Sequence, residues 1–395
     1  MRCTMYGLSV IFMVILGIKQ EFMYRNMSGL QMQNKGIIFN DYRKIGDVLA
    51  QNDIKKPFVC CGKSFQKTKI FEYLKQFDIV VFDNIRPNPR FEDMVDGAKI
   101  FNDNHCDFII GAGGGSPIDS AKMIRLITTN DIATCLSEPM NNNDIKSLYI
   151  PTTAGTGAET TKSSVFYINE KDKKSIANLD FLPDYILLDS SLLETLPDYQ
   201  RKVTCLDALC HSIESYWSVK ATDESRKYAR KGILGFVENK DGYISNTKKG
   251  NEGMLWASYY AGRAINITGT TCAHAMCYNI TMNCNTAHGH SVASGLSVIW
   301  EYMIEHHNEL NGNLTEEELI KTFDEIGVML GGKNAQDGLR IFLQILKDFD
   351  LPYPKTDLSN IPLFVSKVDV TRLSNNPVKF TSDDLTNIYT EIFKR

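Results

Sequence analysis

The segment that most restricts the fold is FIIGAGGGSPIDSAK at residues 108–122, where an apolar run is followed by three glycines and a helix-forming sequence. Ser116 is predicted to cap the helix, with Pro117 at its first position and Asp119 three residues after the cap. The glycines at 113–115 can adopt positive φ and let a ligand approach the backbone closely. The pattern predicts a strand, a tight turn and a helix whose free amides face a phosphate, although a plain glycine-rich turn has the same composition. A Walker loop and a GxGxxG motif are excluded, since no Lys-Ser/Thr follows the glycines and Ser116 replaces the last glycine.

A second polar loop, PTTAGTGAETT at residues 151–161, follows another short apolar run. It contains five threonines and two glycines, which offer hydroxyl groups and bare amides to a ribose or a pyrophosphate. Both loops are expected at the carboxyl ends of parallel strands, which is where α/β sheets bind nucleotides. Together they predict a dinucleotide site, whereas either loop alone would be interpreted as a polar turn.

Short β-rich runs alternate with helical stretches through the first half of the chain, and each run is bounded by Gly, Pro, Asp or Asn. Such runs are typical of strands buried on both faces. We expect strands at Phe58–Cys61, Ile79–Phe82, Phe108–Gly111, Ser147–Ile150 and Tyr185–Leu188, with helices such as Lys67–Gln76 and Phe91–Asn102 between the first three. After about residue 190 only helical patterns follow, such as Thr315–Leu330 and Gln336–Phe349. The predicted fold is a parallel α/β dinucleotide-binding domain at 28–190 and an all-α domain at 191–395.

Length and charge set broader limits. A chain of 395 residues exceeds what one core normally supports, so two domains are expected. The net charge of -4 gives no support for nucleic-acid binding, which needs a basic surface. The densest basic patch is typical of a solvated turn, although anionic ligands also bind such turns; it comprises Lys162, Lys171, Lys173 and Lys174.

The N-terminus contains an apolar run, GLSVIFMVILGI at residues 7–18, that resembles the core of a signal peptide. The run is too short to span a bilayer as a helix, and no small-residue cleavage site follows it. We interpret residues 1–27 as an apolar leader or, preferably, as the product of a start assigned too far upstream. The ten cysteines form no CxxC pair and suit a reducing compartment, so a cytoplasmic protein without membrane association is expected.

A candidate metal site comes from four residues in the second half. Asp207 and His211 are four residues apart in a helical pattern, which places both side chains on one face. His274 and His288 are fourteen residues apart, and a straight helix would separate them by ~21 Å. Both can bind one ion only if the chain reverses between them, for example within the Asn- and Thr-rich run at 279–286. Imidazoles with a carboxylate suit Fe(II), Zn(II) or a similar ion, although single histidines are more often structural.

The segments GGGSPIDSAK, PTTAGTGAET, DALCH and HAM, with HG fourteen residues after the HAM histidine, occur in an order and spacing that resemble the iron-containing (group III) alcohol dehydrogenases. The resemblance implies an oxidoreductase that uses Fe(II) or Zn and NAD or NADP on a small aldehyde or alcohol, and it is compatible with a homodimer. The implied metal ligands are Asp207, His211, His274 and His288. The implied cofactor contacts are Gly114, Gly115, Ser116, Thr152, Thr153, Thr156, Asn88 and Lys174.

The chain departs from this family at two places. Tyr278 stands where many members carry another histidine, four residues after the third ligand. Gly62, followed by Lys63, stands where many NAD-using members carry an aspartate after the first nucleotide-binding strand. That acid would bond the ribose 2′-hydroxyl and repel a 2′-phosphate, so its absence leaves the choice between NAD and NADP open.

The block HAMCYNIT…AHGHSVA and the tail RLSNNPVKFTSDDLTNIY look closest to the phosphonoacetaldehyde reductase branch of the family. This resemblance implies reduction of phosphonoacetaldehyde to 2-hydroxyethylphosphonate. Tyr278 and His290, beside the implied ligands, are the candidate catalytic residues that bind or protonate the substrate. The alternative is that Tyr278 only packs and that His290 faces solvent.

Other functions remain open at this level. A glycerol-dehydrogenase-like polyol oxidoreductase or a dehydroquinate-synthase-like lyase shares the glycine turn but builds its metal site differently. A non-catalytic nucleotide-binding scaffold needs no metal at all. The complete set of four ligand candidates favours the alcohol dehydrogenase.

Overall fold

The structure, a computed structural model, describes residues 36–132, 136, 143–168 and 172–395. The expected leader at 1–27 and the first residues of the expected α/β domain lie outside these ranges. Within them, no helix combines the length and the apolar character that crossing a bilayer requires. The cysteines in the same ranges are free thiols, and all of them except Cys284 are buried.

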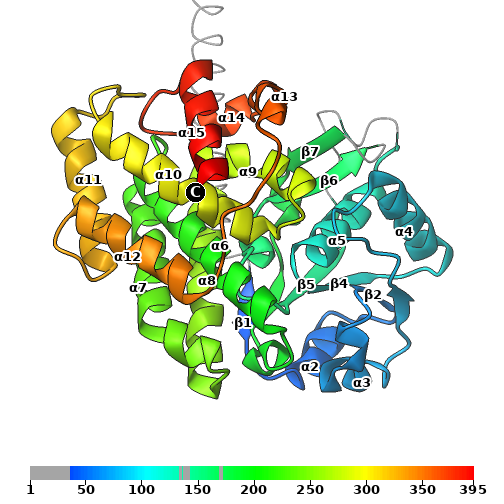
Figure 1. The fold of residues 1–395 in the computed structure, drawn as a ribbon. Coiled ribbons are helices and arrows are strands. Elements are labelled where there is room, and N and C mark those ends of the chain that lie inside the picture. Colours follow the sequence, from blue (N-terminus) through cyan, green and yellow to red (C-terminus); the bar gives the residue numbers. More distant parts are fainter. Residues whose placement is uncertain (1–35, 133–135, 137–142, 169–171) are drawn as a thin grey trace, which may run out of the picture.

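A six-stranded sheet forms the first half of the chain, with the strand order β1-β8-β5-β4-β2-β3 and parallel pairing throughout (Figure 1). All strands except β1 (Ile37–Phe39) match the runs predicted from the sequence. They are β2 (Pro57–Cys61), β3 (Val80–Phe82), β4 (Phe108–Gly113), β5 (Lys146–Pro151) and β8 (Tyr185–Leu187). The expected parallel α/β domain is therefore confirmed.

Helices cover both faces of this sheet. Phe58 and Cys60 of β2 join one buried cluster, whereas Val59 and Cys61 of the same strand join another. Side chains alternate along a strand, so β2 needs apolar residues on both faces and has an unbroken apolar sequence. The first cluster is completed by α4 (Phe91–Asp103) and α5 (Gly115–Ile127), and the second by α2 (Lys44–Gln51) and α3 (Lys69–Leu74).

An antiparallel hairpin of β6 (Ser163–Ile168) and β7 (Asp172–Ala177) follows β5 and was not predicted. The buried Lys122 of α5 holds the base of this hairpin. Its Nζ atom donates to the carbonyl oxygens of Ala158 at 2.7 Å and Ser163 at 2.8 Å and to Thr161 Oγ1 at 3.0 Å. Burying an ammonium group is costly unless its three donors are used, and here three acceptors use them. Lys122 thereby ties the second polar loop to the helix after the glycine turn.

The helix after the glycine turn begins earlier than predicted. Helix α5 begins at Gly115, so Gly114 rather than Ser116 occupies the cap position, and Pro117 is the third helical residue. Gly113 allows this tight entry because it has φ 155°, and a Cβ there would lie 2.4 Å from Pro117 Cγ. Asp119 does not complete a capping box; its Oδ2 instead accepts a hydrogen bond from the Val165 amide of β6 at 3.2 Å.

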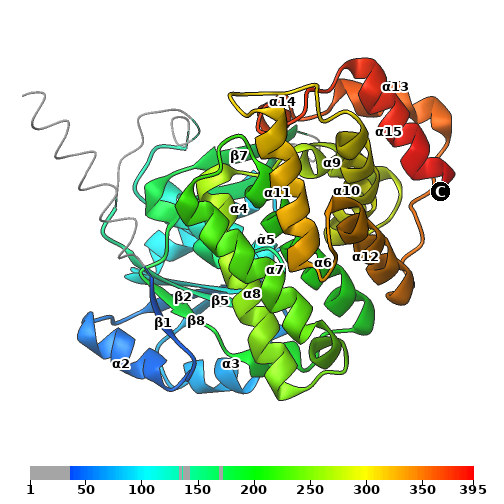
Figure 2. The same ribbon diagram turned by 90° about the vertical axis from the view of Figure 1, so that its left-hand side faces the viewer.

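From Asp198 onward the described residues form helices and no further sheet, as expected (Figures 1 and 2). The long helix α6 (Asp198–Trp217) is buried along most of its length in the largest apolar cluster. The helices around it are α7 (Asp223–Ile244), α8 (Lys248–Thr268), α9 (Cys272–Asn283), α10 (His288–Glu305), α11 (Glu316–Met329), α12 (Ala335–Asp348), α13 (Ile361–Ser366), α14 (Val370–Leu373) and α15 (Ser382–Lys394).

Candidate active site

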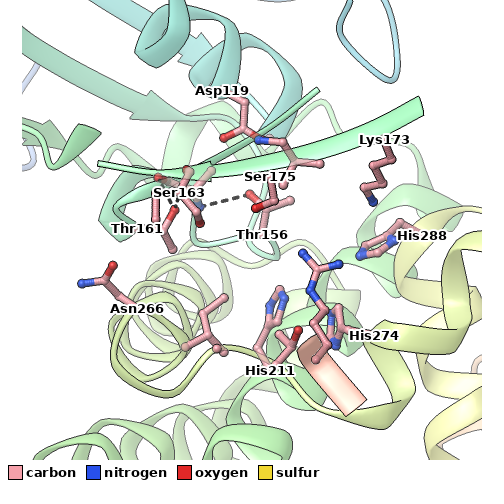
Figure 3. A pocket seen from close by; sticks show the side chains of 18 of the residues that line it. Asp119, Thr156, Thr161, Ser163, Lys173, Ser175, His211, Asn266, His274 and His288 are labelled. Carbon is pink, nitrogen blue, oxygen red and sulfur yellow. Dashed lines mark hydrogen bonds between the residues drawn. The ribbon is translucent and has the colours of Figure 1, made fainter. Parts of the chain in front are cut away.

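A cavity of about 600 Å³ is lined by residues from both halves of the chain. The glycine turn, the second polar loop and the β6–β7 hairpin contribute from the first half, and α6, α8, α9, α10 and α14 contribute from the second. Figure 3 shows the polar side chains of the loops across the cavity from the imidazoles of His211, His274 and His288. The volume falls within the usual range for sites that bind small molecules.

The two polar loops predicted from the sequence lie against each other. The Thr152 amide donates to the Gly113 carbonyl at 2.9 Å, and a Cβ on Gly115 would meet Thr156 at 3.4 Å. Four of the residues expected to contact a cofactor line the cavity, namely Asn88, Gly115, Ser116 and Thr156. The other expected contacts in these loops do not line the cavity themselves, and they are Gly114, Thr152 and Thr153.

Lys174, also expected to contact the cofactor, points away from the cavity. In the hairpin Lys174 pairs with the fully buried Phe166, whereas Lys173 pairs with Tyr167, which lines the cavity. Side chains alternate between the two faces of a strand, so Lys173 faces the cavity and Lys174 is exposed on the opposite face. The structure therefore places Lys173, and not Lys174, at the cavity wall.

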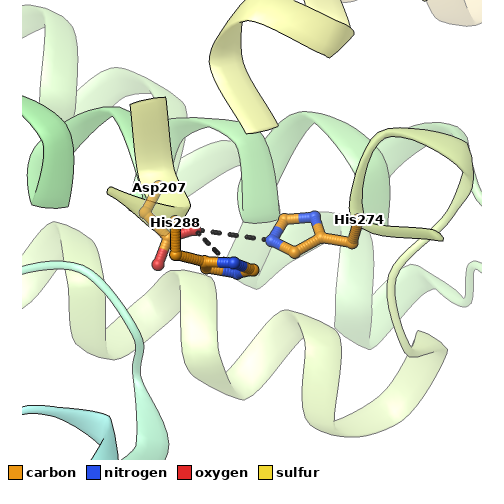
Figure 4. A group of neighbouring side chains, drawn as sticks. All are labelled: Asp207, His274 and His288. Atoms are coloured by element: carbon orange, nitrogen blue, oxygen red, sulfur yellow. Dashed lines mark ion pairs between the residues drawn. The ribbon is translucent and has the colours of Figure 1, made fainter. Parts of the chain in front are cut away.

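The four expected metal ligands lie at one end of the cavity. Asp207 is on α6, His274 on α9 and His288 at the first position of α10, and their ligand atoms all lie within 4.8 Å of one another (Figure 4). Asp207 Oδ1 is 3.4 Å from Nε2 of His274 and 3.9 Å from Nε2 of His288. His211 lies one turn after Asp207, with its Nε2 at 3.9 Å from the same oxygen and its ring stacked on His274 at 4.4 Å.

This arrangement fits a single metal ion. Asp207 Oδ1 and His274 Nε2 are buried and, within the described part of the chain, neither has a partner in hydrogen-bond geometry. Unsatisfied buried polar atoms are costly, and a bound cation would satisfy both. A tetrahedral ion with bonds of about 2.1 Å separates its ligand atoms by roughly 3.4 Å, close to the observed separations. One carboxylate and three imidazoles are a donor set that suits Fe(II) or Zn(II).

Two of the three imidazoles are in the protonation state that metal binding requires. Burial, opposed in part by Asp207, lowers the pKa of His211 to about 4 and that of His288 to about 3. Burial would lower the pKa of His274 as well, but the charges of Glu214 and Asp207 outweigh it and raise that pKa to about 9. Neutral imidazole is the form that binds a metal, so His211 and His288 are already in this form at neutral pH.

Glu214 belongs to the site and was missed by the sequence interpretation. It is fully buried on α6, and its carboxylate makes a short contact with Nδ1 of His274 and accepts from Thr271 Oγ1 at 2.7 Å. Metal-binding histidines commonly donate their second ring nitrogen to a carboxylate, which fixes the orientation of the ring. The signal was present in the spacing, because Glu214 lies seven residues after Asp207 and therefore on the same face of the helix.

The chain reverses between His274 and His288, as a shared ion requires. Helix α9 ends at Asn283 and α10 begins at His288, so the turn falls at the end of the predicted 279–286 run. Gly289 allows α10 to approach α6 closely, and this approach places His288 beside Asp207. A Cβ on Gly289 would lie 2.0 Å from the Val203 carbonyl oxygen and 2.9 Å from Asp207 Cβ.

Tyr278, one of the two candidate catalytic residues, lines the cavity beside the metal ligands. Its ring stacks on His288 with centroids 5.9 Å apart, and its hydroxyl oxygen accepts a hydrogen bond from Arg372 of α14. Because Arg372 donates, the phenolic hydrogen stays available for another acceptor.

His290, the other candidate catalytic residue, lies outside the cavity lining, and its side chain is bonded elsewhere. It is 4% exposed and does not line the cavity. Nε2 donates to the Pro352 carbonyl at 2.8 Å, which leaves Nδ1 as the acceptor for Tyr199 Oη at 3.0 Å. Both ring nitrogens are thus used in bonds between α6, α10 and the segment after α12. The alternative that His290 faces solvent is wrong, since the ring is buried.

Comparison with known proteins identifies the family. The model of the iron-containing alcohol dehydrogenases matches residues 35–190, and the model of the C-terminal domain of the same family matches residues 202–393. The chain belongs to the iron-containing alcohol dehydrogenases. It is therefore an oxidoreductase of the alcohol dehydrogenase and aldehyde reductase type.

Individual relatives differ in the reaction that they catalyse. The chain is 27% identical over 329 residues to lactaldehyde reductase from Escherichia coli, across 78% of this chain and 83% of that protein. It is 30% identical to the NADPH-dependent butanol dehydrogenase of Clostridium saccharobutylicum, across 56% of this chain and 59% of that one. It is similar in structure to an iron-containing alcohol dehydrogenase from Thermotoga maritima, with 26% identity, a TM-score of 0.79, and coverage of 92% of this chain and 98% of that one. A sulfoacetaldehyde reductase from Bifidobacterium kashiwanohense, solved with NAD+, shares the fold at 22% identity, with a TM-score of 0.81 and coverage of 91% and 96%.

Proposed function

We propose that this dehydrogenase transfers hydride between NAD(P)H and a short aldehyde at a metal held by Asp207, His211, His274 and His288. The observation that carries the proposal is the position of Asp207 Oδ1, which faces three imidazole Nε2 atoms in a cavity that extends to the first turn of α5. The unpaired amides of that turn are suited to a pyrophosphate, and the metal end of the same cavity is suited to a carbonyl group.

When bound, the ion would supply Lewis acidity toward the carbonyl oxygen, and the nicotinamide would supply the hydride. The side chains of the protein orient the reactants and supply the proton. Glu214 holds the His274 ring in the tautomer that leaves Nε2 free. Tyr278 carries its phenolic proton at the cavity wall beside His288. From there it can donate this proton to the oxygen of the substrate as the alcohol forms. Arg372 fixes the direction of that phenol by donating to its oxygen.

The metal assignment is tested by His274→Ala and His288→Ala, with His307→Ala as the matched control. His307 follows the end of α10, is paired with Glu316 at 2.8 Å and does not line the cavity. Elemental analysis after Fe(II) or Zn(II) loading should find one metal per chain in the wild type and the control, and little in either ligand variant. Stoichiometric metal in both ligand variants would contradict the assignment.

The cofactor assignment is tested by Gly114→Val. A Cβ at this position meets Thr153 at 3.5 Å, an ordinary contact, so the fold tolerates a side chain there. A branched side chain would nevertheless obstruct the approach of a pyrophosphate to the glycine turn. Titration of protein fluorescence with NADH and NADPH should show a dissociation constant raised at least tenfold, and unchanged titration would mean that the turn is only structural.

The substrate that we propose in first place is phosphonoacetaldehyde, reduced to 2-hydroxyethylphosphonate, because the blocks around residues 274–293 and 372–389 resemble that branch. An aldehyde panel with NADH and NADPH tests it. Oxidation of glycerol in preference to reduction of any aldehyde would favour a polyol dehydrogenase, and elimination of phosphate without a change in NAD(P)H would favour a lyase. A protein purified without metal, and inactive after metal loading, would favour a nucleotide-binding scaffold.

A further inference from the structure

Two cations from distant parts of the chain meet at Tyr278, at the metal end of the cavity. Lys173 comes from β7, and its Nζ lies over the Tyr278 ring. Arg372 comes from α14; its guanidinium carbon is 5.0 Å from the centre of the same ring, and it donates to the phenol oxygen. Both side chains line the cavity together with His288, and Figure 3 shows the Lys173 ammonium directed toward the His288 ring.

The charges of these two groups are only partly compensated. Arg372 has an ion pair with Asp369 at 3.4 Å, whereas no carboxylate of the described residues lies within ion-pair distance of Lys173. Burial, followed by the positive charge of Arg372, lowers the pKa of Lys173 to about 7. Two neighbouring cations repel each other, and an anion that contacts both would offset this repulsion.

The rest of the cavity supplies no competing anion at this end. Its lining includes the cations Lys162, Lys173, Lys220 and Arg372. The carboxylates in that lining are Asp119 and Asp207. Asp119 accepts from the Val165 amide and lies 3.8 Å from Lys122 Nζ, and Asp207 is a candidate metal ligand. The end of the cavity that holds Tyr278 is therefore electropositive, and more so with a divalent ion bound.

We propose that Arg372 and Lys173 form the subsite that binds an oxyanion group of the substrate, and that the substrate class is a short aldehyde carrying a terminal phosphonate or a similar tetrahedral oxyanion. This inference rests on the proposed function, because the subsite binds the oxyanion end of a substrate whose aldehyde end reacts at the metal. A guanidinium presents a rigid fork of donors that matches such a group, and the ammonium adds a point charge.

The spacing limits the length of the substrate. Arg372 is in contact with Tyr278, and Tyr278 is stacked on the candidate ligand His288, so the guanidinium is two ring contacts away from the metal centre. An oxyanion held by Arg372 and a carbonyl that reacts beside His288 would then lie at the same end of the cavity, which favours a short substrate. Long-chain aldehydes would place their apolar tail against two charged groups, which costs free energy.

The experiment compares phosphonoacetaldehyde with the neutral aldehyde butanal in wild type, Arg372→Gln, Arg372→Lys and Lys173→Gln, with Arg340→Gln as the control. Arg340 is an exposed arginine paired with Asp337, so its substitution changes the net charge equally without touching the cavity. The ratio of kcat/KM for the phosphonate over butanal should fall about 10- to 100-fold in Arg372→Gln and Lys173→Gln, because each loses a charge-assisted hydrogen bond. Arg372→Lys should recover part of that ratio, and Arg340→Gln should leave it unchanged.

An equal loss on both aldehydes would overturn the subsite. So would an unchanged ratio accompanied by a raised dissociation constant for NADPH, which would assign the two cations to the phosphates of the cofactor. If Arg372→Gln does not fold, as judged by thermal melting, Lys173→Gln decides in its place. Binding of 2-hydroxyethylphosphonate to the metal-loaded protein, measured by calorimetry, gives a readout without turnover.

Should the wild type reduce no aldehyde yet bind this phosphonate through Arg372, the proposed function fails and the subsite stands. Should it reduce butanal but neither bind nor reduce the phosphonate, the subsite fails alone.

Discussion

The carboxylate of Glu214 contacts Nδ1 of His274, and this contact turns the Nε2 atom of the ring toward Asp207 Oδ1 at 3.4 Å. The same carboxylate accepts hydrogen bonds from the hydroxyl and the amide of Thr271, so its position is fixed by the residue directly before α9. One buried side chain thus determines both the tautomer and the direction of a candidate metal ligand.

Glu214→Gln should weaken metal binding without removing it. The amide has the same shape but no charge, so the imidazole is less basic and less firmly oriented, and the dissociation constant for the metal should rise about 10- to 100-fold. Glu325→Gln is the matched control, because Glu325 also contacts α6, where it accepts from Tyr216 Oη at 2.7 Å. Competition with a chelator measures the dissociation constant for the metal in both variants. Equal affinities in the two variants would mean that Glu214 has only a structural role.

Gly289→Ala should displace His288 and lower metal content, although no ligand is altered. A Cβ would lie 2.0 Å from the Val203 carbonyl oxygen, so the first turn of α10 must move away from α6. Gly295→Ala on the same helix is the control, since its Cβ would meet atoms only at 3.9 Å. We expect Gly289→Ala to retain its helical circular dichroism while losing most of its bound metal, and retained metal would show that α10 adapts without moving its histidine.

Gly62→Asp should shift cofactor preference toward NADH. Gly62 follows β2 directly, and Cys61 pairs with Ala112, so it lies beside the start of the glycine turn. A Cβ there meets Ser64 Oγ only at 4.0 Å, so the carboxylate has room. It would bond the ribose 2′-hydroxyl and repel a 2′-phosphate. The ratio of kcat/KM for NADH over NADPH should rise at least tenfold in Gly62→Asp and less in Gly62→Asn. An unmoved ratio would show that Gly62 does not face the ribose.

Glu159→Gln should stabilise the protein at alkaline pH and have little effect at acidic pH. Glu159 is 1% exposed, its Oε1 has no hydrogen-bond partner among the described residues, and burial raises its pKa to about 7 from 4.5. When the pKa of a carboxyl group is higher in the folded than in the unfolded state, the free energy of unfolding falls as the pH rises from 4.5 through 7. The decrease is at most roughly 3 kcal/mol. Thermal melts at pH 5 and pH 8 measure the effect, with the exposed Glu252→Gln as control. A gain of equal size at both pH values would contradict the assigned ionisation.

The parts of the fold that the sequence predicted are those with strong local patterns. Strands such as β2 and β4 are unbroken apolar runs because both faces are buried, and the helical half shows long amphipathic periods. The hairpin β6–β7 was not predicted because its sequence alternates weakly and its base is held by Lys122, which is distant in sequence. The meeting of Lys173 and Arg372 at Tyr278 could not be predicted either, since the two residues are 199 positions apart in the sequence and only the packing of β7 and α14 near α9 brings both to Tyr278.

The division of the cavity between the two halves of the chain has a thermodynamic consequence. The candidate metal ligands all come from residues 207–288, whereas the polar loops come from 113–161, and His211 Nδ1 lies 3.4 Å from the Gly155 carbonyl where the two meet. Metal would then stabilise the helical half and a dinucleotide mainly the sheet half, each by an amount that grows with the logarithm of its concentration over its dissociation constant. A substrate touching Lys173 and the metal centre at once would couple the two, so that calorimetric transitions separate in the partly liganded protein and merge in the ternary complex.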